Sequence, residues 1–187
     1  MSEKQRCPWV SSDPLYIEYH DYEWGIPQHD DQKLFEAVIL DGFQAGLSWL
    51  TILRKRENFR KAFDNFDAKK IINYDETKVA ELMQDAGIIR NKSKILAAIG
   101  NAKAYLEVQK EFGSFDKYIW QFTGHKTIKN KPKSIKDYKA LSPESDAMSK
   151  DMKKRGFKFC GTTICYAFMQ ATGMVNDHSE NCWAKNN

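Results

Sequence analysis

Two cysteines and two histidines lie close to the two ends of this 187-residue chain and could bind a metal ion. Cys7 and His20 are near the start, and only three residues separate His178 from Cys182 near the end. Thiolate and imidazole are preferred zinc ligands in closed structural sites, and one short turn can present both. We therefore predict one structural zinc ion per chain, holding the terminal segments together. The alternative is four ordinary residues, since the wide separation is not that of a zinc finger.

Aromatic and polar side chains are concentrated in two segments, DPLYIEYHDYEWG and LDGFQAGLSW. They supply Tyr16, Tyr19, Tyr22, Trp24, Asp41, Gln44 and Trp49. A flipped-out nucleobase needs aromatic faces to stack on and a nearby group that accepts a hydrogen bond from its edge. Both are present here. In the alternative interpretation, Trp9 and some of the tyrosines fill a core beneath the zinc site.

The segment MKKRGFKFCGTTICYAFMQATG predicts two helices joined by a short turn that contains Gly156 and Gly161. The second helix is expected to begin at Thr162 or Thr163. Free backbone N–H groups at such a helix start can bind a phosphate without reading any base. Basic residues crowd the same turn, namely Lys153, Lys154, Arg155 and Lys158. The alternative is a plain helical hairpin with a solvated basic face.

The remaining pattern is helical, and we expect an all-α fold in a single domain over residues 1–187. Apolar periodicity predicts helices over 31–46, 48–63, 75–87, 91–113, 114–124 and 142–156, with N-caps at Asp31, Ser48, Asp75, Asn91, Ser114 and Ser142. The lysine-rich stretch HKTIKNKPKSIKDYKALSP contains two prolines and few large apolar residues, so it is expected to be an exposed connection.

The composition limits the class of protein. The chain has 29 basic and 25 acidic residues and a net charge of +4, which indicates a local basic face and permits an anionic partner. A signal-peptide pattern and a membrane-length apolar run are both missing from the sequence, so we expect a cytoplasmic protein without a membrane partner. In that reducing compartment Cys160 and Cys165 are expected to be small packed residues.

Five strings, in this order and over nearly the whole chain, resemble the bacterial 3-methyladenine DNA glycosylase I family. They are DPLYIEYHDYEWGIP, LDGFQAGLSW, QDAGIIRNKSKI, KKRGFKFCGTTICYAFMQA and GMVNDH. The resemblance implies a monomeric helix-hairpin-helix DNA glycosylase that removes 3-methyladenine from double-stranded DNA in base excision repair. It also implies that the free base is released, that an abasic site remains, and that the zinc is structural.

The resemblance assigns roles to individual residues. Cys7, His20, His178 and Cys182 match the zinc ligands, and Tyr16, Tyr19, Trp24 and Trp49 match the base pocket. Gly46 and Leu47 match the loop that enters the gap left by the extruded nucleotide. The hairpin, about residues 153–172, matches the element that binds the DNA backbone, with Lys158, Gly161 and Thr162 as its contacts. Thr163 stands where bifunctional relatives carry a lysine nucleophile, so no lyase step is expected.

One position departs from the family pattern. The pocket carboxylate, to which the resemblance assigns the catalytic role, is normally glutamate, whereas this chain has Asp41. Aspartate keeps the charge but is one methylene shorter, and a shift on the order of 1 Å can weaken a directional contact. Either the helix lies closer to the base or the enzyme is slower, and Phe43 is a candidate for compensating bulk. Many relatives in the wider superfamily carry a catalytic aspartate shortly after the hairpin, but the resemblance to this particular family implies that Asp177 does not take that role.

Two other classes of function are compatible with the sequence. The first is a non-catalytic zinc-stapled DNA-binding protein of the same fold, which release of free base from alkylated DNA would exclude. The second is a zinc-stapled helical protein that binds a small aromatic ligand, for which salt-dependent binding to duplex DNA is not expected.

Overall fold

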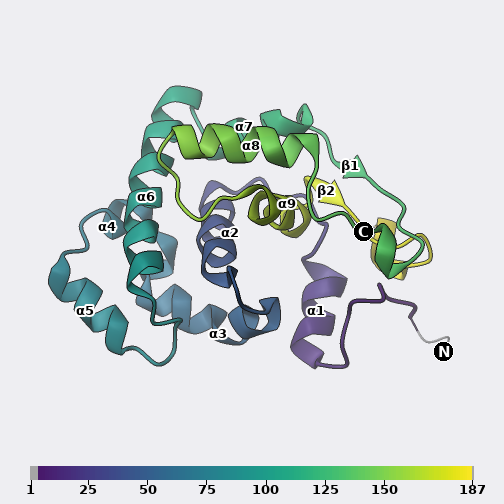
Figure 1. The fold of residues 1–187 in the computed structure, drawn as a ribbon, viewed down its shortest axis with the longest axis horizontal. Helices are drawn as coiled ribbons and strands as arrows, with labels where there is room; N and C mark the ends of the chain where they lie inside the picture. The colour runs from purple at the N-terminus through teal and green to yellow at the C-terminus, as the bar shows by residue number, and fades with distance from the viewer. Residues whose placement is uncertain (1–3, 187) are drawn as a thin grey trace.

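The computed structural model describes residues 4–186, which form a mainly helical molecule (Figure 1). Its elements in chain order are α1 (Pro14–Tyr22), α2 (Asp31–Gln44), α3 (Trp49–Ala62), η1 (Asp64–Phe66), α4 (Ala68–Ile71), α5 (Glu76–Gln84), α6 (Lys92–Phe112), α7 (Phe115–Trp120), η2 (Gln121–Thr123), β1 (Ile128–Lys129), η3 (Ile135–Asp137), α8 (Pro143–Lys154), α9 (Thr162–Ala171), β2 (Val175–Asn176) and η4 (Trp183–Asn186). Within these residues no helix combines the length and the apolar character needed to cross a membrane. The expected single domain included residues 1–3 and 187, which lie outside the described part.

Helix α2 lies at the centre and contacts α3, α6, α7 and α9. Helices α4, α5 and α6 lie on one side of it, whereas α1 and the two chain ends lie on the other (Figure 1). The buried face of α2 carries Leu34, Phe35 and Ile39 into the main core, as the apolar pattern predicts. A second, smaller apolar cluster forms near the chain ends around Cys7, Tyr19, Trp24 and Cys182.

Most of the predicted helix starts are confirmed. Side chains of Ser48, Asp75, Asn91, Ser114 and Ser142 cap α3, α5, α6, α7 and α8, each accepting a backbone hydrogen bond in the first turn. Gly113 ends α6 in a left-handed conformation with φ +82°. These starts were predictable because a cap depends on neighbouring residues alone.

Two details of the helix ends were wrong. The cap of α2 is Asp30, and Asp31 instead accepts hydrogen bonds from the backbone N–H groups of Phe115 and Asp116, which anchors α7. Helix α5 ends at Gln84, before Gly87, and the side chain of Asp85 accepts the N–H of Gly87 in a turn. Both differences come from side-chain hydrogen bonds that compete with the expected caps.

Helix α1 lies in the aromatic-rich segment for which the apolar pattern predicted no helix. Asp13 caps it, and Pro14 occupies its first turn. Its buried residues, Tyr19, His20 and Asp21, are mostly polar, so no apolar stripe marks it in the sequence. The Asp-Pro pair was the available signal.

The fold is mainly helical, as expected, and β1 and β2 add one short parallel pair to it (Figure 1). Ile128 pairs with Val175 and Lys129 with Asn176. Strands of two residues are too short to show alternation in the sequence. We call residues 126–139 the lysine segment; β1 attaches this segment to the chain that follows α9.

Gly173 is required by the close approach between the end of α9 and the segment before α2. A Cβ atom at this position would lie 2.3 Å from the backbone carbon of Ile26 and 2.3 Å from the nitrogen of Pro27. Gly124 also has a positive φ, but it has open space around it. It therefore provides a matched control.

We expect Gly124→Ala to lower the free energy of unfolding by about 1–2 kcal/mol, the cost of a left-handed alanine. Gly173→Ala should lose about 1–3 kcal/mol more, because backbone atoms must move apart. Urea denaturation of both variants measures this difference. Equal losses of unfolding free energy in the two variants would show that the backbone at Ile26 and Pro27 moves aside without an energetic cost.

Candidate functional site

The structure brings together Cys7, His20, His178 and Cys182. All four are buried, and their ligand atoms lie within 4.8 Å of one another. The Nδ1 of His178 is 3.5 Å from the sulfur of Cys7 and 3.4 Å from that of Cys182, and the Nε2 of His20 is 3.5 Å from the sulfur of Cys182. With Zn–S of about 2.3 Å and Zn–N of about 2.1 Å, tetrahedral geometry separates sulfur and nitrogen ligands by about 3.6 Å. The donor set therefore fits a tetrahedral metal ion.

The ring nitrogens that face away from the cluster have partners of their own. His20 Nδ1 is 2.8 Å from the carboxylate of Asp21, which Arg6 also binds in a bidentate ion pair. His178 Nε2 is 3.0 Å from the backbone oxygen of Trp24. Such acceptors place the ring proton on the outer nitrogen, which leaves the inner nitrogen free to bind a metal.

The pKa values of the two cysteine thiols are shifted in opposite directions by their mutual hydrogen bond. The hydrogen bond with Cys182, followed by those with His178 and His20, lowers the pKa of the Cys7 thiol. The same hydrogen bond raises the pKa of Cys182. One thiolate is thus stabilised by the protein alone.

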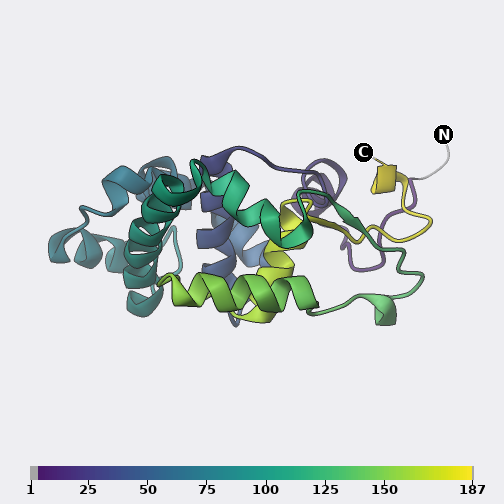
Figure 2. The same ribbon diagram turned by 90° about the horizontal axis from the view of Figure 1, so that it is seen from above.

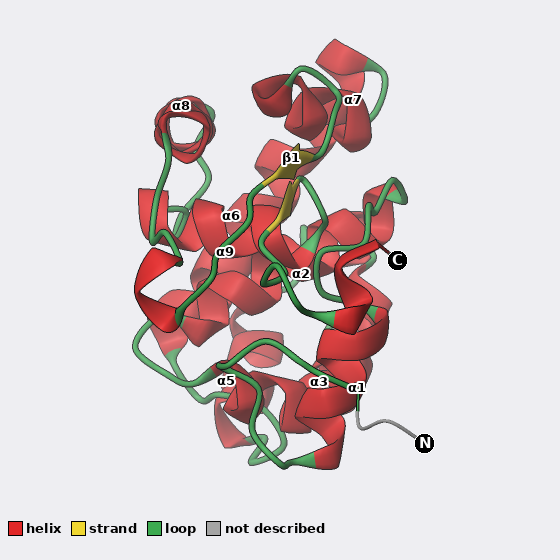
Figure 3. Ribbon diagram, turned by 90° about the vertical axis from the view of Figure 1, so that its right-hand side faces the viewer, coloured by secondary structure: helices red, strands yellow, loops and turns green. Residues whose placement is uncertain are grey.

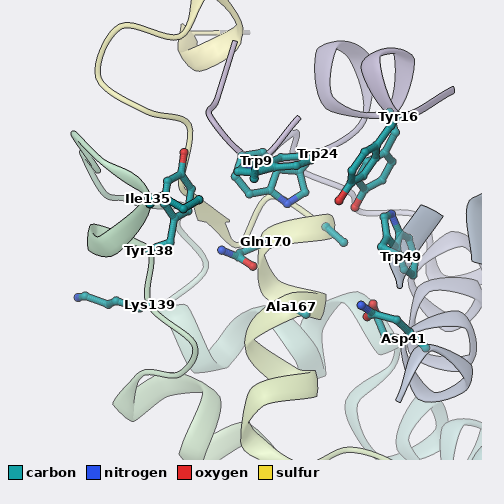
Figure 4. Close-up of a pocket in the computed structure, with 13 residues that line it drawn as sticks. Trp9, Tyr16, Trp24, Asp41, Trp49, Ile135, Tyr138, Lys139, Ala167 and Gln170 are labelled. Carbon is teal, nitrogen blue, oxygen red and sulfur yellow. The ribbon is translucent and has the colours of Figure 1, made fainter. Parts of the chain in front are cut away.

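A cavity of about 280 Å³ lies next to this cluster and contains most of the predicted base-binding residues (Figure 4). Its lining residues are Trp9, Tyr16, Tyr19, Trp24, Asp41, Gln44, Trp49, Ile135, Tyr138, Lys139, Ala167, Gln170 and Ala171. The structure therefore brings together Tyr16, Tyr19, Trp24, Asp41 and Trp49, as the resemblance implies. The predictions did not assign Ile135, Tyr138, Lys139, Ala167 and Gln170 to the pocket.

The aromatic walls come from elements far apart in the chain. Tyr16 and Tyr19 project from one face of α1, with stacked rings 6.5 Å apart, and Trp49 begins α3 directly after its Ser48 cap. Trp9 lies 5.2 Å from Tyr16, 4.8 Å from Trp24 and 5.3 Å from His20, measured between ring centroids. Trp9 therefore belongs both to the pocket and to the packing beneath the Cys/His cluster.

Four residues that line this pocket carry a buried polar atom with no hydrogen-bond partner within residues 4–186: Trp9 Nε1, Trp49 Nε1, Asp41 Oδ2 and Tyr138 Oη. Buried polar atoms are nearly always paired in native proteins, so a group of unpaired ones in one cavity indicates a binding site. Asp41 lies in the last turn of α2 and is 2% exposed. Burial raises its pKa well above the ordinary value of 3.8.

Phe43 does not compensate for the shorter carboxylate. Its ring is buried in the main core, 4.8 Å from Phe59 and 5.8 Å from Phe63, and it does not line the pocket. The two positions differ because residues two apart on a helix project in different directions. That expectation was therefore wrong.

Asp177 does not line the pocket but supports a residue that does. Its carboxylate accepts hydrogen bonds from Tyr166 at 2.8 Å, Gln170 at 2.7 Å and Asn130 at 2.6 Å. Because a carboxylate only accepts, the Gln170 amide must turn its nitrogen toward Asp177. The amide oxygen of Gln170 is therefore directed into the pocket as a hydrogen-bond acceptor (Figure 4).

The loop between α2 and α3 has the exposed apolar tip expected of an inserting element. Leu47 is 41% exposed, and Gly46 adopts φ +80° before it. Lys94, buried on α6, donates hydrogen bonds to the backbone oxygens of Phe43 and Ala45 at 2.8 and 2.7 Å. These bonds satisfy the carbonyls at the end of α2 and fix the base of the loop.

The predicted hairpin joins α8 to α9, and Asn101 of α6 holds it. The Asn101 side chain bonds both the N–H and the oxygen of Lys158, at 2.7 and 3.1 Å. Helix α9 begins at Thr162, and Gly161 at its N-cap offers no side-chain cap, which leaves first-turn N–H groups for a ligand. Phe159, between them, has a strained positive φ of 52°.

Arg155 differs from the other basic residues of the hairpin. Its guanidinium forms ion pairs with Glu111 and Asp151 at 2.6 and 2.7 Å, so it is engaged within the protein. Lys153, Lys154 and Lys158 are exposed. The basic character of the turn therefore comes from its lysines.

The site thus combines a basic helical hairpin with an aromatic pocket that contains a buried carboxyl group, and the second helix of the hairpin, α9, contributes to the pocket wall. The chain belongs to the methyladenine glycosylase family, whose family model matches residues 9–185.

Similar proteins cover nearly the full length of the chain. It is 52% identical to DNA-3-methyladenine glycosylase 1 of Escherichia coli over 95% of both chains, and 48% identical to DNA-3-methyladenine glycosylase of Haemophilus influenzae over 96% of this chain and 97% of the relative. A crystal structure of a 3-methyladenine DNA glycosylase I superimposes with a TM-score of 0.94 at 51% identity, covering 96% of this chain and 98% of the other. A Staphylococcus aureus structure that addresses 3-methyladenine recognition gives 0.93 at 33% identity, covering 96% of each.

The buried carboxyl group has a predictable effect on stability. Since the folded-state pKa of Asp41 is above its ordinary value of 3.8, folding favours the protonated form. Stability is therefore lost as pH rises from about this value through the raised pKa. We expect Asp41→Asn to raise the Tm at pH 8, with a gain that shrinks toward zero as pH falls to about 4.

Asp177→Asn provides a control in which the Tm is expected to change in the opposite direction. An amide cannot accept from all three donors that surround Asp177, so this variant should have a lower Tm than the native protein. Calorimetry at several pH values compares both variants. A Tm below native for Asp41→Asn at pH 8 would mean that the carboxylate has a stabilising partner in the protein.

Proposed function

We propose that this chain is a monomeric, cytoplasmic DNA glycosylase that hydrolyses the N-glycosidic bond of 3-methyladenine in double-stranded DNA. It releases the free base and leaves an abasic site. The observation that carries this proposal is the aromatic cavity with its buried, unpaired carboxyl group. The similarity to enzymes named for 3-methyladenine supports the choice of base.

The reaction requires little assistance from a strong acid. Methylation at N3 gives adenine a positive charge, so the bond between C1′ and N9 is already weak. When this bond breaks, its electron pair stays on the base, which leaves as a neutral molecule. Water adds its oxygen to C1′ and loses a proton. The protein must chiefly extrude the nucleotide, recognise the cationic base and surround it.

Asp41 is the catalytic residue in this proposal. A cationic base next to it lowers the pKa that burial raises, so the carboxylate forms as the base enters. The resulting charge pair in a dry cavity favours the alkylated base over a neutral one. The unpaired oxygen of Asp41 is available for a donor on the edge of the base.

The other pocket residues select the base by stacking and by hydrogen bonding. Tyr16, Tyr19, Trp24 and Trp49 offer aromatic surfaces, with base stacking worth about 1–3 kcal/mol per aromatic residue. The fixed amide oxygen of Gln170 accepts from an amino group but repels a carbonyl oxygen. Adenine carries an amino group at C6 where guanine carries oxygen, so this acceptor favours 3-methyladenine over 3-methylguanine.

The DNA backbone is bound by the hairpin, through Lys158 and the N–H groups after Gly161 and at Thr162. Leu47, with Gly46 before it, enters the gap left by the extruded nucleotide. At the start of α9 stands Thr163, which cannot form a Schiff base, so the enzyme is monofunctional. The fixed hairpin backbone at Lys158 supports this assignment.

Zinc is the metal that the Cys/His cluster is proposed to hold. Two thiolates and two imidazoles would form a closed set with no open position, which is the pattern of a structural site. The bound ion would hold the terminal segments together. All four candidate ligands are buried, which supports a structural role for the ion.

The proposed activity is tested with methylated duplex DNA under single-turnover conditions, with identification of the released bases. We expect the native protein to release 3-methyladenine, and Asp41→Asn to be about 10- to 100-fold slower, the loss of a charge-assisted contact of about 1.5–3 kcal/mol. Asp41→Glu, which keeps the charge and extends the reach, should match or exceed the native rate.

Two outcomes would contradict this assignment. Binding of DNA without base release would identify a non-catalytic DNA-binding protein. An Asp41→Asn variant with native excision rate and native affinity for free 3-methyladenine would remove Asp41 from the mechanism.

The metal proposal is tested on the purified protein by metal analysis and thermal unfolding. We expect one zinc per chain. Cys182→Ser should lose zinc and lower the Tm by at least about 5 °C, which corresponds to about 2 kcal/mol in a chain of this size. Cys165→Ser, a buried cysteine outside the cluster, should keep its zinc. Complete loss of excision by Cys182→Ser at native Tm would instead show a catalytic metal.

A further inference from the structure

The positive charge of this protein is concentrated in the lysine segment, residues 126–139. The segment carries six lysines and a single acidic residue, Asp137. The whole chain has 29 basic and 25 acidic residues, so the rest has 23 basic and 24 acidic residues. Without this segment the protein would have no net positive charge to attract DNA.

These lysines are exposed and mostly without ion pairs. Lys133 lies 3.9 Å from Glu180, but Lys126, Lys129, Lys131, Lys136 and Lys139 form no ion pair within the described residues. Five of the six arginines, at 6, 54, 56, 60 and 155, are in contrast paired with carboxylates, and within the described residues Arg90 alone among them forms no ion pair. The available cationic groups are therefore unevenly distributed.

The backbone of the segment is firmly attached despite its exposed side chains. Ile128 and Asn130 donate to Met174 and Asn176 at 2.9 and 3.0 Å, and Pro132 accepts from Glu180 at 3.0 Å. The single acidic side chain, Asp137, accepts hydrogen bonds from the backbone N–H groups of Lys133 and Ser134. A segment held in this way loses little conformational entropy when it binds a partner.

The segment also forms one wall of the base pocket. Ile135, Tyr138 and Lys139 line the cavity opposite Asp41 and Trp49, and the amine end of Lys139 points away from it (Figure 4). In Figure 2, η3 within the segment and helix α8 of the hairpin both lie along the lower edge of the molecule. In Figure 3, the chain after β1 runs down the left side, on which α8 also lies.

We propose that the lysine segment is a second contact for the DNA backbone, binding phosphates next to the nucleotide whose base enters the pocket. This inference rests on the proposed function, since it takes duplex DNA as the partner. The hairpin and the segment would then hold the backbone on two sides of the pocket mouth. Contacts of lysine with phosphate carry no sequence information, which suits an enzyme that must find damage anywhere.

The test is a triple variant, Lys129→Ala/Lys131→Ala/Lys136→Ala, compared with Lys61→Ala/Lys69→Ala/Lys103→Ala. The control removes the same charge from exposed lysines of α3, α4 and α6 that do not line the base pocket. Binding to an undamaged duplex is measured as a function of salt. Each lost phosphate contact lowers the slope of log K against log salt by about 0.9. We expect the slope of the segment variant to fall by about 2–3 and that of the control by less than about 1.

Free 3-methyladenine is the second probe, with tryptophan fluorescence as the signal. The segment variant should bind it as tightly as the native protein, because none of the three substituted lysines lines the pocket. A native salt slope, an equal fall in the control, or weakened binding of the free base would each overturn the inference. Failure of the native protein to release base would contradict the proposed function alone, since the salt slope is measured on undamaged DNA.

Discussion

The convergence of Cys7, His20, His178 and Cys182 is the constraint on which the functional half of the molecule depends. It joins the segment before α1 to the segment after β2, and the rings of Trp9 and Trp24 pack on its histidines. The same region holds Pro132 of the lysine segment through Glu180. The tryptophan wall of the pocket and the wall formed by the lysine segment are thus both attached to the region of the Cys/His cluster. A closed ligand set can therefore influence DNA binding and base recognition without taking part in the chemistry.

The pocket also shows how activity and stability oppose each other. Burial of Asp41 without a partner costs folding free energy, and in the proposed function the same burial would make it responsive to a cationic base. The carboxylate of Asp177, also buried, accepts hydrogen bonds from three donors, of which Gln170 lines the pocket. Two buried aspartates thus differ in role because one is satisfied by the protein and the other is left for a ligand.

Features that depend on residues close together in the chain could be predicted from the sequence, whereas features that depend on contacts between distant residues could not. The caps of α3, α5, α6, α7 and α8 were predictable because Ser48 and its counterparts act on the next few residues. The Cys/His cluster and the aromatic residues of the pocket were predicted from their residue types and the family resemblance. Gln170, Tyr138 and Lys139 were not identified, because their place in the pocket depends on the pairing of β1 with β2 and on the support of Asp177. Such contacts arise only in the tertiary structure and leave no periodic pattern.

The parallel pairing of β1 with β2 has a consequence for the order of folding. It connects Ile128 to Val175 across a long loop, and the Cys7 and Cys182 side chains meet across nearly the whole chain. Closing such loops costs entropy that only the assembled native contacts offset. During synthesis the helices from α2 to α7 can pack while the chain is still growing, whereas the cavity cannot form until Ala167, Gln170 and Ala171 of α9, which line it, are available. The pocket is therefore completed only at a late stage of assembly.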